Sequence, residues 1–270
     1  MNTKVHHKVK VANGDPLVLI DFLTHATKMS KSRLKVVLTR GGVWSIRRKK
    51  LRVRRATSEV RAGDIFEVYD DTKLELPDVS GVYALEDGDQ YSVWFKPAGV
   101  FSQGTPYGDE GSMLRLLEKS KREVFLIHRL DRETAGIMLF AHTSKAAAML
   151  SKQFADNEIT KIYQAEVKGK IEQSIGVIDR DLGGKHALTH YQVIKRTENS
   201  TFVQIELETG RLHQARRHFE AIGHPILGDP KYGKKNKDLR GLQLVASELT
   251  VPWIFKEPKH YTLNEDLRLF

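Results

Sequence analysis

Apolar residues in the first 70 positions recur mostly at helical spacing, and turn residues divide them into short segments. An aspartate followed by proline predicts a helix start at Asp15, because both residue types favour that position. A second helix follows, capped by Ser30 or Ser32 and ended by a Gly-Gly pair. Short strands at 43–46 and 65–69 complete a compact unit of two helices and a small sheet.

Beyond residue 90 the pattern changes to strands, with two helices among them. One helix is capped by Thr143 or Ser144, and the other begins near Leu212 and stops before Gly223. This predicts an α+β fold: a domain built on a large mixed, mainly antiparallel sheet with flanking helices, plus a small N-terminal α/β domain. The strands are expected at YSVWF, VFLIHRL, IMLFA, KIYQAEVKG, HYQVIKR, TFVQIELE and LQLVA.

Composition divides the chain into five segments. Residues 1–13 are interpreted as an N-terminal tail and 14–70 as a basic domain. Between residues 70 and 89 seven acidic residues stand against one lysine, which indicates a linker between domains, at 71–90. The larger domain is expected at 91–252, followed by a C-terminal extension at 253–270.

Positive charge is concentrated in the basic domain. The whole chain carries a net charge of +10, whereas residues 28 to 61 hold 13 Lys and Arg against one acid, a local charge of +12. Such clustering exceeds what solubility requires and favours a nucleic acid as partner, with an anionic membrane as the weaker alternative. The cations expected to contact the polyanion are Arg33, Arg47, Arg48, Lys49 and Lys50.

Several classes of protein are excluded by what the sequence lacks. Without cysteine there are no disulfides, thiolate metal sites or cysteine nucleophile. No run approaches the roughly 20 apolar residues of a membrane span, and the N-terminus lacks the apolar core of a secretory signal. A cytoplasmic protein without a membrane partner is therefore expected.

The basic domain is similar to a known RNA-binding unit. FL followed by SKSRLKVVLTRGGVWSI and then VRAGDIFEV resembles the small domain shared by a ribosomal small-subunit protein and many RNA-modifying enzymes. The likeness covers about residues 14 to 70. The chain departs from such domains at one turn, which they often build from Asn-Gly and which here consists of the four cations 47–50. This departure leaves the geometry of the hairpin open and strengthens the attraction for phosphates.

The larger domain resembles a second family. IHRLDRETAG is similar to the active-site signature of RluA-type pseudouridine synthases, with Ala135 where that family has serine. KPAG, KIY, TGRLHQARRH and GDPKYG match further segments of the same family in the same order. Two departures, Ala215 for a larger aliphatic residue and Gln243 for histidine, remove no catalytic group.

The resemblance implies a site around one aspartate. Asp131 follows an apolar strand and is flanked by Arg129 and Arg132, which favour its ionised form. A carboxylate beside a ribose can act as nucleophile, stabilise positive charge on the sugar or remove a sugar proton, and pseudouridine formation needs no cofactor because it has no net redox change. Which atom Asp131 engages stays open.

Other residues take roles from the same motifs. Tyr163 is the tyrosine expected to contact the target base and to serve in the final proton removal, and Arg211 is the arginine expected to pair with the aspartate. Residues expected to bind the substrate or shape its site are Arg129, Arg132, His128, Lys96 and Gln214. No metal is expected, because the His186 and His190 pair lacks neighbouring acids.

Two other functions fit parts of the sequence. One is a catalytically silent RNA-binding or ribosome-assembly factor, and the other an enzyme acting on a free nucleoside, for which the basic cluster would have no purpose. The preferred prediction is a pseudouridine synthase that acts on flipped-out uridines of structured RNA. Ribosomal RNA of the large subunit is favoured over transfer RNA, and a monomer without an obligate protein partner is expected.

Overall fold

The computed structural model describes residues 3–120, 123–254 and 257–270, and the chain forms two compact units. The first, called the N-terminal unit, comprises Met1–Pro77 with Gln103–Lys121; the second, the large unit, comprises Asp78–Ser102 with Arg122–Phe270. None of the helices described is long and apolar enough to cross a membrane.

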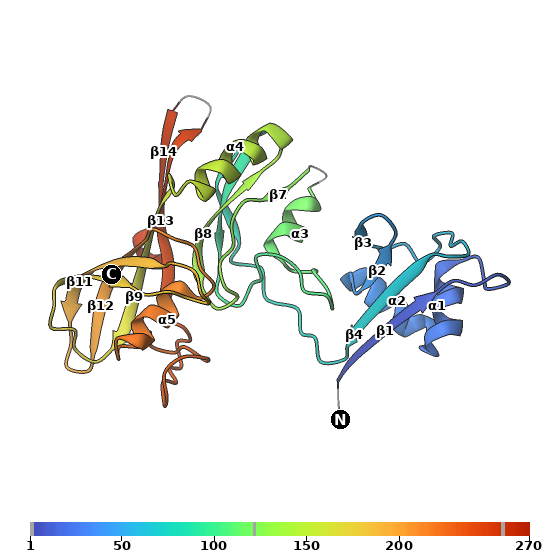
Figure 1. The fold of residues 1–270 in the computed structure, drawn as a ribbon, viewed down its shortest axis with the longest axis horizontal. Helices are drawn as coiled ribbons and strands as arrows, with labels where there is room; N and C mark the ends of the chain where they lie inside the picture. Colours follow the sequence, from blue (N-terminus) through green and yellow to red (C-terminus); the bar gives the residue numbers. More distant parts are fainter. Residues whose placement is uncertain (1–2, 121–122, 255–256) are drawn as a thin grey trace. The chain divides into compact units, whose positions relative to one another are not determined.

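The N-terminal unit is a four-stranded antiparallel sheet with α1 and α2 on one face (Figure 1). The strand order is β1-β4-β2-β3. Its elements are β1 (Lys4–Lys10), α1 (Leu19–Thr27), α2 (Lys31–Arg40), β2 (Val43–Ile46), β3 (Lys50–Arg52), β4 (Ile65–Asp71) and α3 (Met113–Glu118).

The second helix follows the sequence prediction, and the first begins later than expected. Ser30 caps α2 by accepting a hydrogen bond from the Arg33 amide, and Gly41 ends it in the left-handed conformation at φ 85°. The start expected at Asp15 is wrong, because its carboxylate instead accepts from the Ala12 amide at 2.8 Å and closes a turn. Val18 is still extended, in a bridge with Glu59, so α1 starts one residue later.

Two segments join the N-terminal unit unexpectedly. Residues 4–10, interpreted as a tail, form β1 and pair with β4 along its whole length. Their pattern shows little apolar signal because β1 is an edge strand whose lysines face solvent, as edge strands often do. Residues 103–121, expected in the larger domain, belong to this unit, where Asp109 pairs with Arg54 at 2.5 Å and Arg52 at 3.1 Å.

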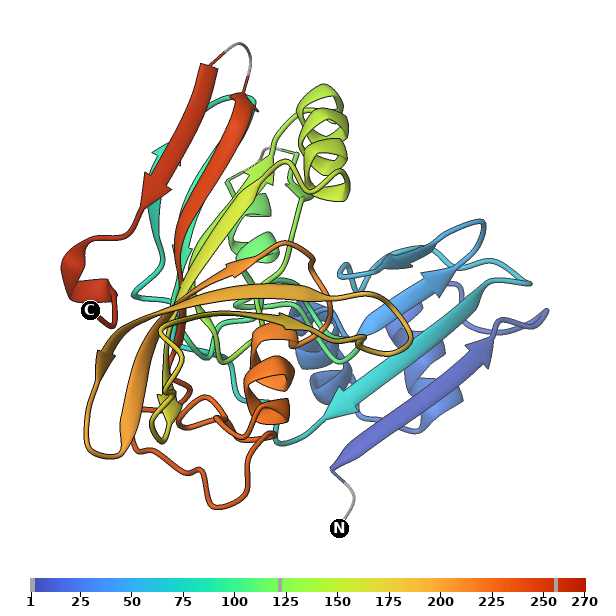
Figure 2. The ribbon, with the colours of Figure 1, turned by 60° about the vertical axis from the view of Figure 1, so that its left-hand side comes forward.

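The large unit is built on a 10-stranded sheet in the order β10-β11-β12-β9-β13-β8-β6-β5, with β14 beside β13 and β7 beside β8 (Figure 2). Pairing is antiparallel except between β8 and β13. With the helices, this confirms the α+β fold class. The elements are β5 (Tyr83–Asp87), β6 (Tyr91–Lys96), β7 (Phe125–Leu126), β8 (Ala135–Ala141), α4 (Ser144–Ala155), β9 (Thr160–Lys168), β10 (Ile175–Asp179), β11 (Leu188–Arg196), β12 (Ser200–Leu207), α5 (Gln214–Ala221), β13 (Leu244–Ile254), β14 (Glu257–Thr262) and the 3-10 turn Glu265–Leu267.

Some elements of the large unit differ from the sequence pattern. The run VFLIHRL forms only the two-residue strand β7, because the chain then turns into the loop that carries Asp131. Strand β10 escaped prediction because its apolar residues lie on both faces: Ile175 and Val177 are 66% and 57% exposed, and Ile178, at 6%, lies in the core. The C-terminal extension supplies β14 and the 3-10 turn.

Candidate active site

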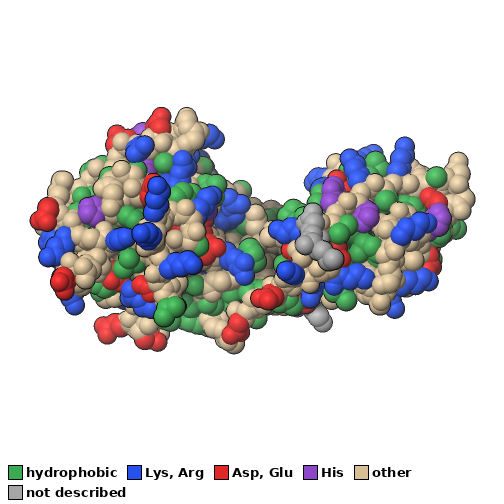
Figure 3. Space-filling view, turned by 90° about the horizontal axis from the view of Figure 1, so that it is seen from below, with side chains coloured by type: hydrophobic (Ala, Val, Ile, Leu, Met, Phe, Trp, Pro, Cys, Tyr) green, Lys and Arg blue, Asp and Glu red, His purple; other side chains and the backbone are tan. Residues whose placement is uncertain are grey.

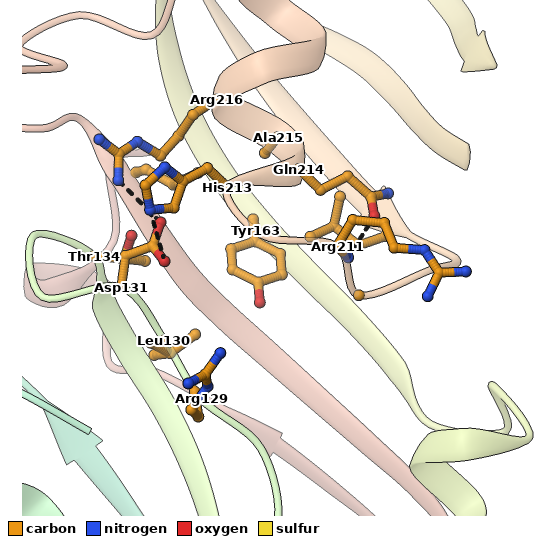
Figure 4. Close-up of a pocket in the computed structure, with 13 residues that line it drawn as sticks. Arg129, Leu130, Asp131, Thr134, Tyr163, Arg211, His213, Gln214, Ala215 and Arg216 are labelled. Atoms are coloured by element: carbon orange, nitrogen blue, oxygen red, sulfur yellow. Dashed lines mark hydrogen bonds and ion pairs between the residues drawn. The ribbon is translucent and has the colours of Figure 1, made fainter. Parts of the chain in front are cut away.

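A pocket in the large unit collects residues from segments far apart in the sequence (Figure 4). It holds about 490 Å³ of empty space, including the part open to solvent. The loop before β8, strand β9, the ends of β12 and β13, and the first turn of α5 all contribute. The lining residues are Arg129, Leu130, Asp131, Thr134, Tyr163, Leu207, Gly210, Arg211, His213, Gln214, Ala215, Arg216 and Leu244.

The loop that carries Asp131 is held by backbone contacts to the segment after β6. The buried Ser102 hydroxyl donates to the Leu130 carbonyl at 2.6 Å and accepts from the Leu130 amide at 3.0 Å. The Gly99 amide donates to the Arg132 carbonyl at 2.7 Å. These bonds lie on both sides of Asp131, so they restrict where its carboxylate can point.

Lys96 reinforces the same contact from inside the protein. It is 0% exposed, and its Nζ donates to the carbonyls of Val100 at 2.8 Å, Pro97 at 3.0 Å and Arg132 at 3.3 Å. Burial lowers the pKa of Lys96 to about 7, against the pull of the Asp131 and Glu133 charges. Lys96 therefore ties the two loops together beneath the pocket and does not line it.

Arg216 holds the carboxylate of Asp131. Its Nη1 donates to Asp131 Oδ2 at 3.0 Å, while Nε and Nη2 form a forked pair with Asp229 at 2.7 and 2.9 Å. The Arg216 side chain is 2% exposed and that of Asp229 is fully buried. Although burial opposes the charge, hydrogen bonds to Asp229 and Asp131 outweigh it and raise the pKa of Arg216.

The pairing predicted for Arg211 is therefore corrected. Arg211 Nε donates to the His186 carbonyl at 2.9 Å, and Figure 4 shows its guanidinium directed away from Asp131. Arg211 lies in the turn before α5, whereas Arg216 is the third residue of that helix and faces the aspartate. Both arginines stand in the motif TGRLHQARRH, and their spacing alone does not tell which one reaches Asp131.

Tyr163 comes to the pocket from β9, and its ring lies between Asp131 and Arg211 in Figure 4. Burial raises the pKa of Tyr163, and the negative charge of Asp131 raises it further. The phenol is therefore neutral near pH 7. It can offer a ring face and one hydroxyl to a bound base.

His213 is a neighbour of Asp131 that the sequence analysis did not single out. Its Nε2 is 3.7 Å from Asp131 Oδ1, and its Nδ1 lies 3.0 Å from the Tyr232 hydroxyl. The residue adopts φ 54°, a left-handed conformation that is uncommon outside glycine and often marks functional sites. Burial lowers the pKa of His213, so its neutral form faces the carboxylate at pH 7. The sequence offered one indication of His213, because it precedes Gln214 within the motif TGRLHQARRH.

Of the expected substrate contacts, Gln214 and Arg129 line the pocket, and His128 and Arg132 do not. The side-chain amide of Gln214 accepts a hydrogen bond from the backbone N–H of Arg211 at 3.0 Å and donates one to the Leu188 carbonyl at 2.9 Å. These bonds shape the turn before α5. His128 accepts from the Leu139 amide at 2.9 Å, and burial lowers its pKa to about 3. Arg132 donates to the Gly99 carbonyl at 3.1 Å.

The basic residues of the N-terminal unit are less available than the sequence suggested. Arg33 pairs with Asp70, Arg47 with Asp64 and Lys50 with Glu67. Arg48 and Lys49 are exposed and form no ion pair within the part of the chain that the structure describes. Acids distant in sequence thus neutralise part of the +12 cluster.

Histidines 186 and 190 do not make a metal site with their neighbours. His186 Nε2 lies 3.1 Å from Asp179, and His190 Nε2 lies 3.3 Å from Glu208. Among residues 3–120, 123–254 and 257–270, no three acidic, histidine or cysteine side chains are grouped to hold an ion. The two histidines therefore form separate surface pairs.

Comparison with known proteins identifies the large unit. Residues 90–221 match the family model of RNA pseudouridylate synthase. An uncharacterized RNA pseudouridine synthase of Aquifex aeolicus is 31% identical over 69% of this chain and 68% of that protein. The dual-specificity RNA pseudouridine synthase RluA of Vibrio cholerae is 37% identical over 63% of this chain and 75% of its own. The ribosomal large subunit pseudouridine synthase D of Zymomonas mobilis is 38% identical over 42% of this chain and 40% of that protein.

Solved structures agree with this assignment. Human RNA pseudouridylate synthase domain containing 4 superposes with a TM-score of 0.56 at 25% identity, over 67% of this chain and 87% of that chain. Human RNA pseudouridylate synthase domain containing 1 shares the fold, with a TM-score of 0.61 at 22% identity over 71% of this chain and 86% of that chain. From its sequence, its fold and these relatives, the chain belongs to the RluA-type family of RNA pseudouridine synthases.

Proposed function

We propose that this protein isomerises uridine to pseudouridine in structured RNA with Asp131 as the essential catalytic group. One observation carries the proposal: Asp131 lies in an open pocket with one oxygen bound by a buried arginine, beside a neutral tyrosine. The preferred substrate is large-subunit ribosomal RNA rather than transfer RNA. The proposed enzyme works as a cytoplasmic monomer without cofactor or metal.

The reaction defines what the pocket must supply. The bond between ribose C1′ and uracil N1 breaks, the base turns, and a bond from C1′ to C5 forms. The C5 proton is then lost and N1 gains one, so atoms and electrons balance without an oxidant or reductant. Among the described lining residues, Asp131 has the one carboxylate, which can bond to carbon or accept a proton.

The contacts of Asp131 suit this chemistry. Arg216 holds Oδ2 by a hydrogen bond at 3.0 Å, which leaves Oδ1 for the reacting nucleoside. His213 faces Oδ1 across 3.7 Å and is held from behind by Tyr232. The three routes open to the aspartate, attack on the sugar, attack on the base or removal of a sugar proton, all need one ionised oxygen in a set place.

Tyr163 lies beside the proposed position of the uracil base and contacts it. Burial raises the pKa of Tyr163, which disfavours a phenolate near neutral pH, so its hydroxyl enters the reaction in the neutral form. Its ring can stack on the uracil, and its hydroxyl can exchange a hydrogen bond during the final proton transfer. The proton leaving C5 then passes to Asp131 or to water.

The choice of RNA rests on relatives and on charge. The Zymomonas mobilis relative is named for the ribosomal large subunit, and the Vibrio cholerae relative for dual specificity. Loops and bulges are favoured targets, because the base must leave its stack to enter the pocket. Exposed cations of the N-terminal unit, Arg48 and Lys49 among them, would hold the flanking backbone.

The test is a map of pseudouridine at nucleotide resolution in ribosomal and transfer RNA. It compares cells with the wild-type gene, without it, with Asp131→Asn, and with Asp181→Asn as a control at an exposed loop aspartate. Sites lost in the deletion and in Asp131→Asn, and kept in Asp181→Asn, support the proposal and name the substrate. If Asp131→Asn keeps every site, the catalytic assignment is wrong; if purified wild type also forms no pseudouridine, a silent RNA-binding factor is favoured.

A further inference from the structure

The sheet of the N-terminal unit has one face that α1 and α2 do not cover. Val43, Phe66 and Val68 point inward from β2 and β4 and belong to the core that packs against α1 and α2. Since side chains alternate along a strand, Trp44 and Tyr69 point to the opposite face. Figure 2 shows both helices on one side of β1 and β4, so neither helix covers the other face. The loop at 105–107 lies over part of that face, where Trp44 Nε1 donates to the Pro106 carbonyl at 3.0 Å and Arg52 donates to the Thr105 carbonyl at 2.7 Å.

Aromatic rings meet across this outer face. His6 on β1 stacks on Tyr69 on β4, with ring centroids 4.2 Å apart and planes within 8°. Tyr107, from the segment that joins this unit, meets Tyr69 edge-on at 5.6 Å. The Arg52 guanidinium lies 4.0 Å from the centre of the Trp44 ring. His6 is exposed, and the other rings are half-buried, so the aromatic surface is reachable from solvent.

Cations are placed between and around the rings. Lys50 Nζ lies 5.2 Å from the centres of both Trp44 and Tyr69, and Lys4 Nζ lies 5.3 Å from that of Tyr107. Figure 3 shows Lys, Arg and His side chains gathered on the N-terminal unit, at the right of that view. By strand alternation this face holds the cations Lys4, Lys8, Lys10, Lys50 and Arg52 and the acids Glu67 and Asp71.

We propose that this outer sheet face binds a single-stranded segment of the substrate RNA, with unpaired bases on the aromatic rings and phosphates on the lysines of β1, because Lys50 is paired with Glu67. The proposal rests on the RNA substrate proposed above and assigns a second contact to it. Aromatic rings interleaved with cations suit a chain that alternates π faces with negative charge. An acidic peptide would satisfy the lysines but would leave the rings without a planar partner.

The outer face also differs from the cationic turn at Arg48 and Lys49. A turn that offers charge alone holds RNA by its phosphates, without regard to whether bases are paired. The stacked pair His6 and Tyr69 distinguishes paired from unpaired bases, because a base within a duplex has no free face. Preference for single strands is therefore the property to measure.

The experiment uses the full chain and a fluorescent twelve-nucleotide oligoadenylate, which holds no uridine to convert. A ribose-phosphate oligomer of the same length without bases and a duplex of the same length serve as comparison probes. His6→Ala is expected to weaken oligoadenylate binding several-fold and Tyr69→Leu about tenfold, since one stacked base is lost. Binding of the baseless oligomer and of the duplex should change less than about twofold, because phosphate contacts remain.

Two further variants give matched controls. Lys8→Gln with Lys10→Gln is expected to weaken both single-stranded probes and to reduce the salt slope of log K by about 0.7 per residue. Tyr83→Leu removes an aromatic ring of the large unit that is 37% exposed and should leave all affinities unchanged. Because His6 is exposed on an edge strand, His6→Ala keeps the test valid even if Tyr69→Leu lowers the melting temperature.

Several results would overturn the proposal. The proposal fails if folded His6→Ala and Tyr69→Leu both bind oligoadenylate as tightly as the wild type does. It also fails if these variants lose as much affinity for the baseless oligomer as for oligoadenylate, or if the wild type binds an oligoglutamate of equal charge more tightly than oligoadenylate. Pseudouridine formation is measured on the same preparations with structured RNA. If the wild type converts uridine while the aromatic variants bind as it does, only the surface proposal fails; if the wild type converts none, the proposed function fails whatever the binding data.

Discussion

Replacement of Arg216 by glutamine separates the two things that this arginine does. The substitution removes the donor to Asp131 Oδ2 and the forked pair with Asp229. Asp131 is 23% exposed and can regain water, whereas the side chain of Asp229 is 0% exposed and cannot. Loss of stability should therefore arise at Asp229 and loss of activity at Asp131.

The expected sizes follow from these environments. Leaving a buried carboxylate without its partner costs about 3–5 kcal/mol of unfolding free energy. In a chain of this size that lowers the melting temperature by roughly 6–20 °C. Removing one oriented donor from the group that reacts costs about 10²–10³-fold in kcat. Arg211→Gln should change kcat by less than a few-fold, because the hydrogen bonds of Arg211 go to the Gln214 side chain and the His186 carbonyl and not to Asp131.

The assay measures single-turnover pseudouridine formation on a structured RNA, together with thermal unfolding of each variant. The double variant Arg216→Gln with Asp229→Asn removes the unpaired buried charge, so it should regain most of the lost stability. Its activity should stay low, because Asp131 still lacks its donor. The reasoning fails if Arg211→Gln, properly folded, loses activity as strongly as Arg216→Gln, or if the double variant recovers both stability and turnover.

The remaining predictions concern pH, charge and metal. Burial lowers the pKa of Lys96 to about 7, from 10.5, so the unfolded chain binds more protons than the folded chain between these pH values. The free energy of unfolding of the wild type, measured in urea relative to Lys96→Met, should therefore rise from pH 7 to 10.5. A difference that does not change with pH would contradict this prediction. Because neutral His213 faces Asp131 Oδ1 at 3.7 Å, His213→Gln should lower kcat about 10- to 100-fold. It should also remove the part of the acid-side fall in rate that comes from protonation of His213, and an unchanged pH profile would contradict this role. Arg48→Gln with Lys49→Gln should reduce the salt slope of log K for RNA by about 1 per residue, and an unchanged slope would exclude these contacts. Chelator should leave turnover on a prefolded substrate unchanged, and a loss restored by one metal would reveal a required ion.

Much of the local structure was readable from the sequence because it depends on neighbouring residues. Ser30 accepts from an amide three residues on, and Thr143 does the same at the start of α4. Gly41 ends α2 at φ 85°, where a side chain would be strained. Strands β6, β8, β9, β11 and β12 coincide with apolar runs because each lies within a sheet with a buried face.

The sequence did not predict the edge strands β1 and β10 or the unit to which residues 103–121 belong. Most residues of β1 are exposed, so its burial shows little pattern. In β10 burial alternates, but Ile175 and Val177 stand on the exposed face, so apolar residues do not mark the buried one. Residues 103–121 join the N-terminal unit through Asp109, whose partners lie more than fifty positions earlier in the chain. Contacts of that kind are set by the fold and have no local signature.

The sequence by itself determined the fold class, the family, and the position of Asp131 in a loop between strands. Those properties follow from hydrophobic periodicity and from motifs that keep their spacing. Only the tertiary structure decided which arginine holds Asp131, since Arg216 and Asp131 are 85 positions apart. It also decided how much of the basic cluster is free, because Asp70, Asp64 and Glu67 neutralise cations they approach only after folding. The sequence gives the number of charges, but ion pairs depend on distance, and side chains far apart in the sequence become partners only when folding brings their helices, strands and loops together.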